Sequence, residues 1–177
     1  MIDLDECGLF VETAARGFGK CYIGKRVNEE DPYSKSEKWT LLLAISGDPD
    51  AQRWKKIWAD GGTTNGRMVD LIEEILEDIG PGTPHRRRCF IMDNLTSHHS
   101  AQVETLIHVA GHRIVFRAPY YPVDGPIEYV FNSLQVALWI NMHKIRTGPN
   151  LLHQVSIAIA GMQSFEPYFI HCGYWRD

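Results

Sequence analysis

The middle and end of the chain show apolar residues at helical spacing. Apolar positions three or four residues apart run from Met68 to Ile79, with acidic residues mostly between them. This period predicts an amphipathic helix that ends at Gly80-Pro81-Gly82. Similar spacing predicts a second helix from Val103 to Ala110, closed by Gly111. A long helix is expected to start at Pro126, and a last one covers Leu151 to Met162.

Short apolar runs predict the strands. Trp39 to Ser46 is nearly all apolar, as expected of a strand buried on both faces, and Cys89 to Met92 and Arg113 to Arg117 are shorter runs. Asp3-Leu4-Asp5 resembles the tail of a strand whose beginning is missing. Two further strands are expected at Gly8 to Ala14 and Cys21 to Val27, joined by a turn at 16–19; residues 51–66 fit neither period clearly.

The order of these elements indicates the fold class. Antiparallel strands come first and are followed by alternating helices and strands. That order is typical of an α/β, RNase H-like three-layer sandwich, a mixed five-stranded sheet with helices on both faces, although other α/β folds share parts of it. The length fits a single domain over residues 1–177.

Composition narrows the cellular setting. Hydrophobic residues make up 44% and charged residues 23%, which excludes global disorder. No apolar run approaches the roughly 20 residues of a membrane span, and the first six residues carry three acids and no base, unlike a signal peptide. Four cysteines lack the C-x-x-C spacing of a zinc site. We expect an intracellular protein, in the nucleus of a eukaryote or otherwise in the cytoplasm or nucleoid.

Three acidic residues stand where predicted elements end or begin. Asp5 follows the first strand, Asp93 directly follows Cys89 to Met92, and Glu128 lies in the first turn of the long helix. Sites in open α/β sheets gather at the carboxyl ends of strands, so these acids are candidates for chemistry. An acid at such a position, taken alone, is more often a helix cap or a turn residue.

The neighbours of two of these acids favour a functional role. Asp93 is followed within six residues by Asn94, His98 and His99. Residues 118–128 contain three prolines and a glycine, which predict a rigid loop that delivers Glu128 to the start of a helix.

These segments resemble the DDE superfamily endonuclease domain of mariner-like transposases and their bacterial insertion-sequence relatives. Three blocks carry the resemblance, at the spacing typical of the group: Asp5-Glu6-Cys7-Gly8-Leu9-Phe10, then Met92-Asp93-Asn94 with His98, and finally Pro119-Tyr120-Tyr121-Pro122 with Pro126-Ile127-Glu128.

The resemblance implies a metal-dependent transposase catalytic domain that cleaves DNA and transfers the strand. Asp5, Asp93 and Glu128 would bind two divalent ions, Mg²⁺ or Mn²⁺, with Asp93 bridging both. DNA would be the partner, and the joining of two DNA ends would suit a homodimer. No nucleotide cofactor and no membrane are expected.

Further residues are expected around this site. Asn94 and His98 would support a carboxylate or touch a DNA phosphate. The basic cluster Arg86-Arg87-Arg88 would touch DNA or direct nuclear import, or would be a solvated loop. Gln135 stands where many relatives have a lysine, seven residues past the glutamate, and is a candidate DNA contact.

The chain also departs from the family pattern. It begins only a few residues before Asp5, so we expect that acid to be held loosely and the family's DNA-binding helix-turn-helix region to be missing. Gly125 replaces an asparagine that could cap the helix of Glu128, with Asp124 as a candidate substitute. Two alternatives stay open: a hydrolase of the RNase H or Holliday-junction type, and a non-catalytic, transposase-derived DNA-binding or interaction protein.

Overall fold

The computed structural model describes residues 1–11, 37–48, 50, 52–59, 61–93, 100–117 and 125–174. Its strands form one sheet in the order β3-β2-β1-β4-β5. The strands are β1 (Ile2–Phe10), β2 (Lys38–Ser46), β3 (Arg53–Ala59), β4 (Cys89–Met92) and β5 (Arg113–Phe116). The helices are α1 (Asn65–Ile79), α2 (Ala101–Val109), α3 (Pro126–Ile140), the short 3₁₀ helix η3 (Met142–Lys144), α4 (Gly148–Ala160) and α5 (Glu166–His171).

The sheet is mixed, and β1 lies at its centre. β1 pairs antiparallel with β2, and β2 pairs antiparallel with β3. On its other side β1 pairs parallel with β4, which pairs parallel with β5. The five-stranded mixed sheet and its helices confirm the fold class predicted from the order of elements.

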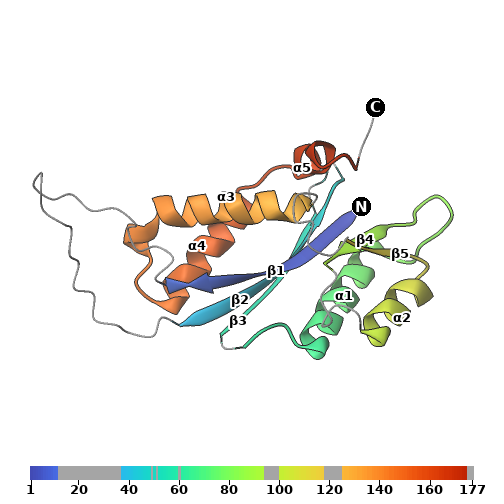
Figure 1. The fold of residues 1–177 in the computed structure, drawn as a ribbon, viewed down its shortest axis with the longest axis horizontal. Helices are drawn as coiled ribbons and strands as arrows, with labels where there is room; N and C mark the ends of the chain where they lie inside the picture. The colour runs from blue at the N-terminus through green and yellow to red at the C-terminus, as the bar shows by residue number, and fades with distance from the viewer. Residues whose placement is uncertain are drawn as a thin grey trace, which may run out of the picture.

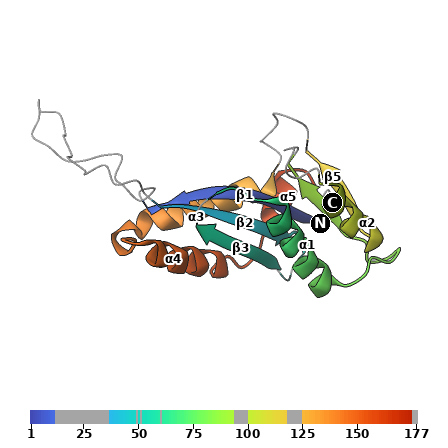
Figure 2. The same cartoon turned by 90° about the horizontal axis from the view of Figure 1, so that it is seen from below.

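Helices cover both faces of the sheet (Figures 1 and 2). On one face, Leu9, Leu43 and Ile91 pack into a buried cluster with residues of α3, α4 and α5. On the other face, Leu4, Leu42 and others pack with α1 and α2. Alternate residues of one strand therefore belong to different layers, as strand geometry requires. We call these the α3 face and the α1 face.

The first strand differs from the prediction. Residues 2–10 form one continuous strand, in which Asp5 is central and buried, so Asp5 is not loosely held at a strand end. The predicted strand at Gly8 to Ala14 was wrong in its first part, because Gly8 to Phe10 pair with β2 as the end of β1. The rest of that run and the predicted strand at Cys21 to Val27 lie outside the described residues.

The third strand comes from the stretch whose period was unclear. β3 is an edge strand, and only Trp54 of its seven residues is buried. Edge strands tolerate charged side chains, and Arg53, Lys55 and Lys56 blur the alternation that marks a strand. These charges have local partners: Lys55 Nζ donates a hydrogen bond to Ser156 Oγ of α4 at 2.9 Å.

The remaining elements agree with the sequence to within a few residues. α1 ends where Gly80 takes a positive φ of 69°, and α3 begins at Pro126 as expected. α4 begins three residues before the predicted start, because Thr147 caps it by accepting a hydrogen bond from the Asn150 N–H. In the part of the chain that the structure describes, no helix is long and apolar enough to cross a membrane.

Candidate active site

Three neighbouring strands, β1, β4 and β5, place charged residues at the same level across the sheet. The last parallel pairs are Leu4 with Met92 and Met92 with Phe116, so Asp5, Asp93 and Arg117 each stand one residue beyond them. The Arg117 N–H donates to the Met92 carbonyl at 2.8 Å, which extends the alignment. Because Leu4 points to the α1 face, strand alternation directs Asp5 to the α3 face.

Glu128 reaches the same region from the helix layer. It lies in the first turn of α3, after Gly125 and Pro126, and its backbone N–H donates to the Gly125 carbonyl at 3.0 Å. The α3 helix packs across β1, the strand that carries Asp5. The fold thus places one acid from β1, one from the end of β4 and one from the start of α3 in the same region.

The pKa of Glu128 reports this proximity. Partial burial raises it first, and the negative charges of Asp5 and Asp93 raise it further, while Arg117 lowers it. Like charges disfavour the ionised form of a neighbouring carboxyl group, so Glu128 lies within the electrostatic field of both other acids.

The sequence did not reveal a buried ion pair at the centre of this site. Arg117 binds the carboxylate of Asp3 through Nη2, and its Nη1 lies 3.3 Å from Asp5 Oδ2. The side chain of Asp3 is 0% exposed and that of Arg117 only 7%. A signal was present, because Asp3 lies two residues before Asp5 on the same face of β1 and Arg117 stands level with Asp93.

Asp3 also replaces the helix cap that Gly125 cannot supply. The Ile127 N–H, at the second position of α3, donates to Asp3 Oδ2 at 2.9 Å. This N–H is one that an N-cap side chain normally satisfies, and Gly125 makes no side-chain bond. Asp124, the substitute considered from sequence, lies outside the described residues.

Gly125 leaves the space that Arg117 occupies. A Cβ atom on residue 125 would lie 2.8 Å from Arg117 Nη1 and 2.9 Å from its Cζ. The glycine and the arginine are therefore a matched pair. A larger residue at position 125 would displace the guanidinium from Asp5.

Burial and attraction act in opposite directions on this ion pair. Burial raises the pKa of Asp3 to about 6, although the charge of Arg117 and the Ile127 hydrogen bond both lower it. Burial lowers the pKa of Arg117, but attraction to Asp3 and Asp5 outweighs it and the net pKa is raised. The pair is ionised near neutral pH, because the pKa of Arg117 is raised and the pKa of Asp3, about 6, lies below neutral pH.

Cys7 and Gln135 border the acids. The Cys7 thiol pKa is raised to about 11, first by burial and then by the charges of Glu128 and Asp5, while a side-chain hydrogen bond with Gln135 lowers it. Gln135 is exposed and lies seven residues, or about two turns, past Glu128. Its position beside the acids is compatible with the predicted DNA contact, which stays a prediction.

The acids have the chemistry of a divalent-metal site without being gathered around one point. Carboxylate oxygens are the ligands that Mg²⁺ and Mn²⁺ prefer, and the mutual repulsion felt by Glu128 is what a bound cation would relieve. Among the described residues, however, no three His, Cys, Asp or Glu side chains are arranged to hold one metal ion. Arg117 supplies the positive charge that Asp5 meets here.

The other predicted residues lie elsewhere. Asn94 and His98 fall outside the described residues. Arg86, Arg87 and Arg88 precede β4, at the end of that strand opposite to Asp93, so they are not part of the acidic site.

The chain matches one known protein family over most of its length. The family described as DDE superfamily endonuclease matches residues 1–151. The chain belongs to this DDE endonuclease superfamily. The match spans all three acids of this DDE chain, and it confirms the resemblance seen in the sequence. A search among curated proteins finds no match.

Solved structures share the fold of this DDE domain. The Mos1 mariner paired end complex with Mn has a TM-score of 0.73 at 18% identity, over 98% of this chain and 51% of that one. A pre-cleavage Mos1 transpososome has a TM-score of 0.72 at 16% identity, over 97% and 51% of the two chains. The Mos1 transposase catalytic domain bound to Raltegravir and Mn gives 0.64 at 14% identity, over 97% and 75%. The chain thus has the fold of a transposase catalytic domain and spans about half the length of the first two relatives.

Proposed function

We propose that the chain is a transposase catalytic domain that cleaves DNA phosphodiester bonds with divalent metal ions and transfers the freed strand to a target DNA. The observation that carries the proposal is the convergence of Asp5, Asp93 and Glu128 from β1, β4 and α3, with electrostatic coupling between Glu128 and the other two. Membership of the DDE endonuclease superfamily supports it.

Asp5, Asp93 and Glu128 would hold the metal ions as oxygen ligands. Two divalent ions, Mg²⁺ or Mn²⁺, would activate the attacking water and stabilise the leaving oxygen when bound. The protein's part is to fix the carboxylates: Asp5 through the Glu6 N–H and Arg117, and Glu128 through the start of a capped helix. Asn94 and His98 would support the carboxylates or touch a DNA phosphate.

DNA is the proposed partner, in a homodimer that would hold two ends. Mos1 structures are named as paired end and strand transfer complexes, which describe that protein. For this chain, strand transfer follows from the same chemistry, because a 3′-hydroxyl freed by cleavage can act as the next nucleophile in the same site.

Cleavage of duplex DNA in Mg²⁺ or Mn²⁺ tests the proposal. Wild type should nick DNA only with a divalent ion, and Asp93→Asn should abolish nicking because the metal ligand loses its charge. Asp70→Asn is the matched control, since Asp70 is an exposed acid of α1 on the opposite face of the sheet. Equal nicking by wild type and Asp93→Asn would refute the proposal.

The products distinguish the reaction from simple hydrolysis. A target duplex joined covalently to a pre-cut donor end is the product of strand transfer. Cleavage restricted to an RNA–DNA hybrid would instead assign the chain to the RNase H type.

A further inference from the structure

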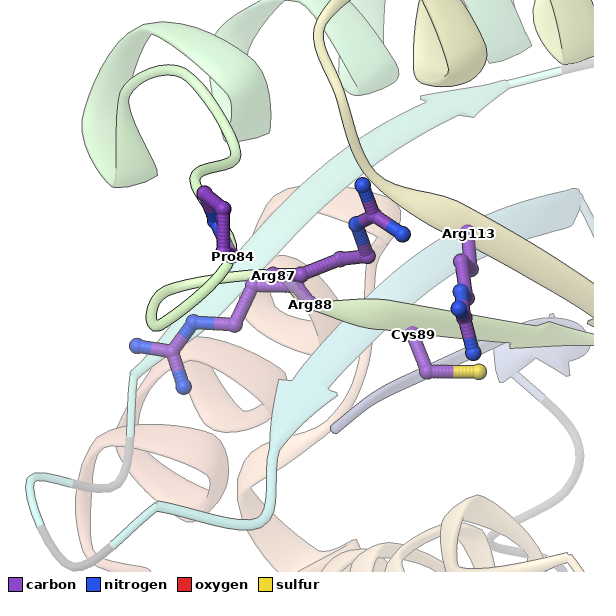
Figure 3. Close-up of a pocket in the computed structure, with 5 residues that line it drawn as sticks. All are labelled: Pro84, Arg87, Arg88, Cys89 and Arg113. Carbon is purple, nitrogen blue, oxygen red and sulfur yellow. The ribbon is translucent and has the colours of Figure 1, made fainter.

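A second charged feature lies at the other end of the sheet. A surface pocket of about 410 Å³ is lined by Pro84, Arg87, Arg88, Cys89 and Arg113 (Figure 3). Cys89 and Arg113 are paired residues of β4 and β5, so their side chains lie next to each other. Pro84 stands on the opposite side, in the loop before β4.

The loop that carries the arginines is fastened to the rest of the fold. Gly82 and Gly111 approach so closely that a Cβ on residue 82 would lie 2.3 Å from the Gly111 carbonyl oxygen. His112 is 3% exposed; its Nδ1 accepts from the Arg88 N–H at 3.2 Å, so its Nε2 is the nitrogen that donates to the Gly80 carbonyl at 2.9 Å. These contacts fix the loop, so the position of the pocket is set by the fold.

Positive charge in the pocket is only partly compensated. Arg88 is paired with Asp48, and its side chain is 31% exposed. Arg87 and Arg113 are exposed, and within the described part of the chain neither has an ion pair. Two unpaired guanidinium groups in a chain of net charge -4 mark a local preference for anions.

Strand geometry relates this pocket to the acids. Cys89 and Asp93 are four residues apart along β4, so strand alternation directs both side chains to the α3 face, with Arg113 beside Cys89. At about 3.3 Å per residue, the two positions are separated by about 13 Å. Phosphates follow one another along the whole length of each DNA strand, so a single duplex can reach both positions.

We propose that the pocket of Arg87, Arg88 and Arg113 binds a backbone phosphate of the substrate DNA, about 13 Å along β4 from the acids that would cleave it. The inference rests on the proposed function, because it takes the acids as the point of cleavage. Guanidinium groups bind phosphate oxygens in bidentate fashion, and 410 Å³ is ample for a phosphate group. The contact reads no base, so it positions the duplex without selecting its sequence.

Salt dependence of DNA binding tests this assignment. A short mixed-sequence duplex is titrated with the whole chain in metal-free buffer, so that cleavage does not intervene. Arg87→Gln with Arg113→Gln should lower the slope of log affinity against log salt by about 0.9 for each lost phosphate contact. Arg146→Gln is the control, since Arg146 is an exposed arginine in the connection between η3 and α4.

Alkylation of Cys89 gives an independent reading inside the pocket. Duplex DNA should slow the alkylation of Cys89 in wild type and protect it less in the double variant. A double variant with the salt slope of the Arg146→Gln control, and no protection of Cys89 in wild type, would overturn the pocket assignment. Stronger displacement of DNA by a poly-glutamate peptide than by unlabelled duplex would overturn it in favour of an acidic protein partner.

The two proposals fail in different ways. Absence of metal-dependent nicking by wild type would refute the proposed function, but the salt dependence of DNA binding could still be interpreted. Unchanged DNA binding by the double variant would refute the pocket assignment while leaving nicking intact.

Discussion

The buried ion pair between Asp3 and Arg117 makes a specific stability prediction. Replacing Arg117 with Leu leaves the Asp3 carboxylate, 0% exposed, without its guanidinium partner. Removing one member of a buried ion pair typically lowers the free energy of unfolding by about 3–5 kcal/mol, because an uncompensated charge remains inside. Asp3 keeps the hydrogen bond from the Ile127 N–H, which places the expected loss near the lower end, about 3 kcal/mol.

Urea denaturation followed by tryptophan fluorescence measures the loss, and buried Trp54 provides a signal. With a slope of about 2 kcal/mol per molar urea, the midpoint should fall by about 1.5 M. Glu74→Ala is the matched control, because its ion pair with Lys56 is exposed, at 42% and 39%, and should contribute at most about 1 kcal/mol.

A double variant separates charge from packing. Asp3→Leu combined with Arg117→Leu removes both charges, and replacing a whole buried pair by apolar residues is often neutral. The double variant also loses the helix cap, at about 1 kcal/mol, while both variants lose the Arg117 contact with Asp5. The double variant should therefore be more stable than Arg117→Leu alone, because no buried charge is left at position 3. A loss of stability in Arg117→Leu no greater than in Glu74→Ala, or a double variant less stable than Arg117→Leu, would show that no buried charge is left uncompensated at Asp3.

Three further predictions concern glycines and a thiol. Gly125→Ala should lower the free energy of unfolding by about 1–3 kcal/mol in urea denaturation, because its Cβ would press on the buried guanidinium of Arg117. The control Gly66→Ala in α1 has open space around it and should raise the free energy of unfolding by up to about 1 kcal/mol. Equal effects of the two variants would contradict the close packing of Gly125 against Arg117. Gly82→Ala should be more disruptive than Gly125→Ala in the same assay, because its clash is with the backbone of Gly111, and a smaller loss would refute that close approach. Burial raises the pKa of Cys89 and Arg113 lowers it, so Cys89 should be alkylated slowly below that pKa. Arg113→Gln should raise the pKa and slow alkylation further at a fixed pH. Faster alkylation in that variant would contradict the effect of the Arg113 charge on Cys89.

Much of the fold was readable from periodicity. The run Cys89 to Met92 is β4 as predicted, and the helices α1, α2 and α3 agree closely with their apolar spacing. Their apolar pattern is clear because each of the three helices buries one face, and β4 is buried on both faces. β3 was not predicted because edge-strand charges interrupt its alternation.

The site was partly predictable, for a different reason. Asp93 and Glu128 sit at recognisable boundaries, after a buried strand and after a proline-rich loop, and the structure confirms those positions within the fold. Asp3 was missed as a part of the site because strand register decides which buried acids meet. The guanidinium of Arg117 reaches Asp3 across β4, a contact between residues far apart in sequence.

The helix cap shows the same limit. Local rules look for a cap within the residues beside a helix start, and they directed attention to Gly125 and Asp124. The cap comes instead from Asp3, on a strand under the helix. Asp3 can act as the cap because α3 packs over β1.

Metal binding is the most direct test of the central claim that Asp5, Asp93 and Glu128 form one metal site. Calorimetric titration of Mn²⁺ into wild type and Asp93→Ala, each with and without a short duplex, measures it. Wild type should bind about two ions per chain, with or without DNA, and Asp93→Ala should lose this binding. No binding in a folded wild-type chain under either condition, or equal binding by Asp93→Ala, would show that the three acids do not form one metal site.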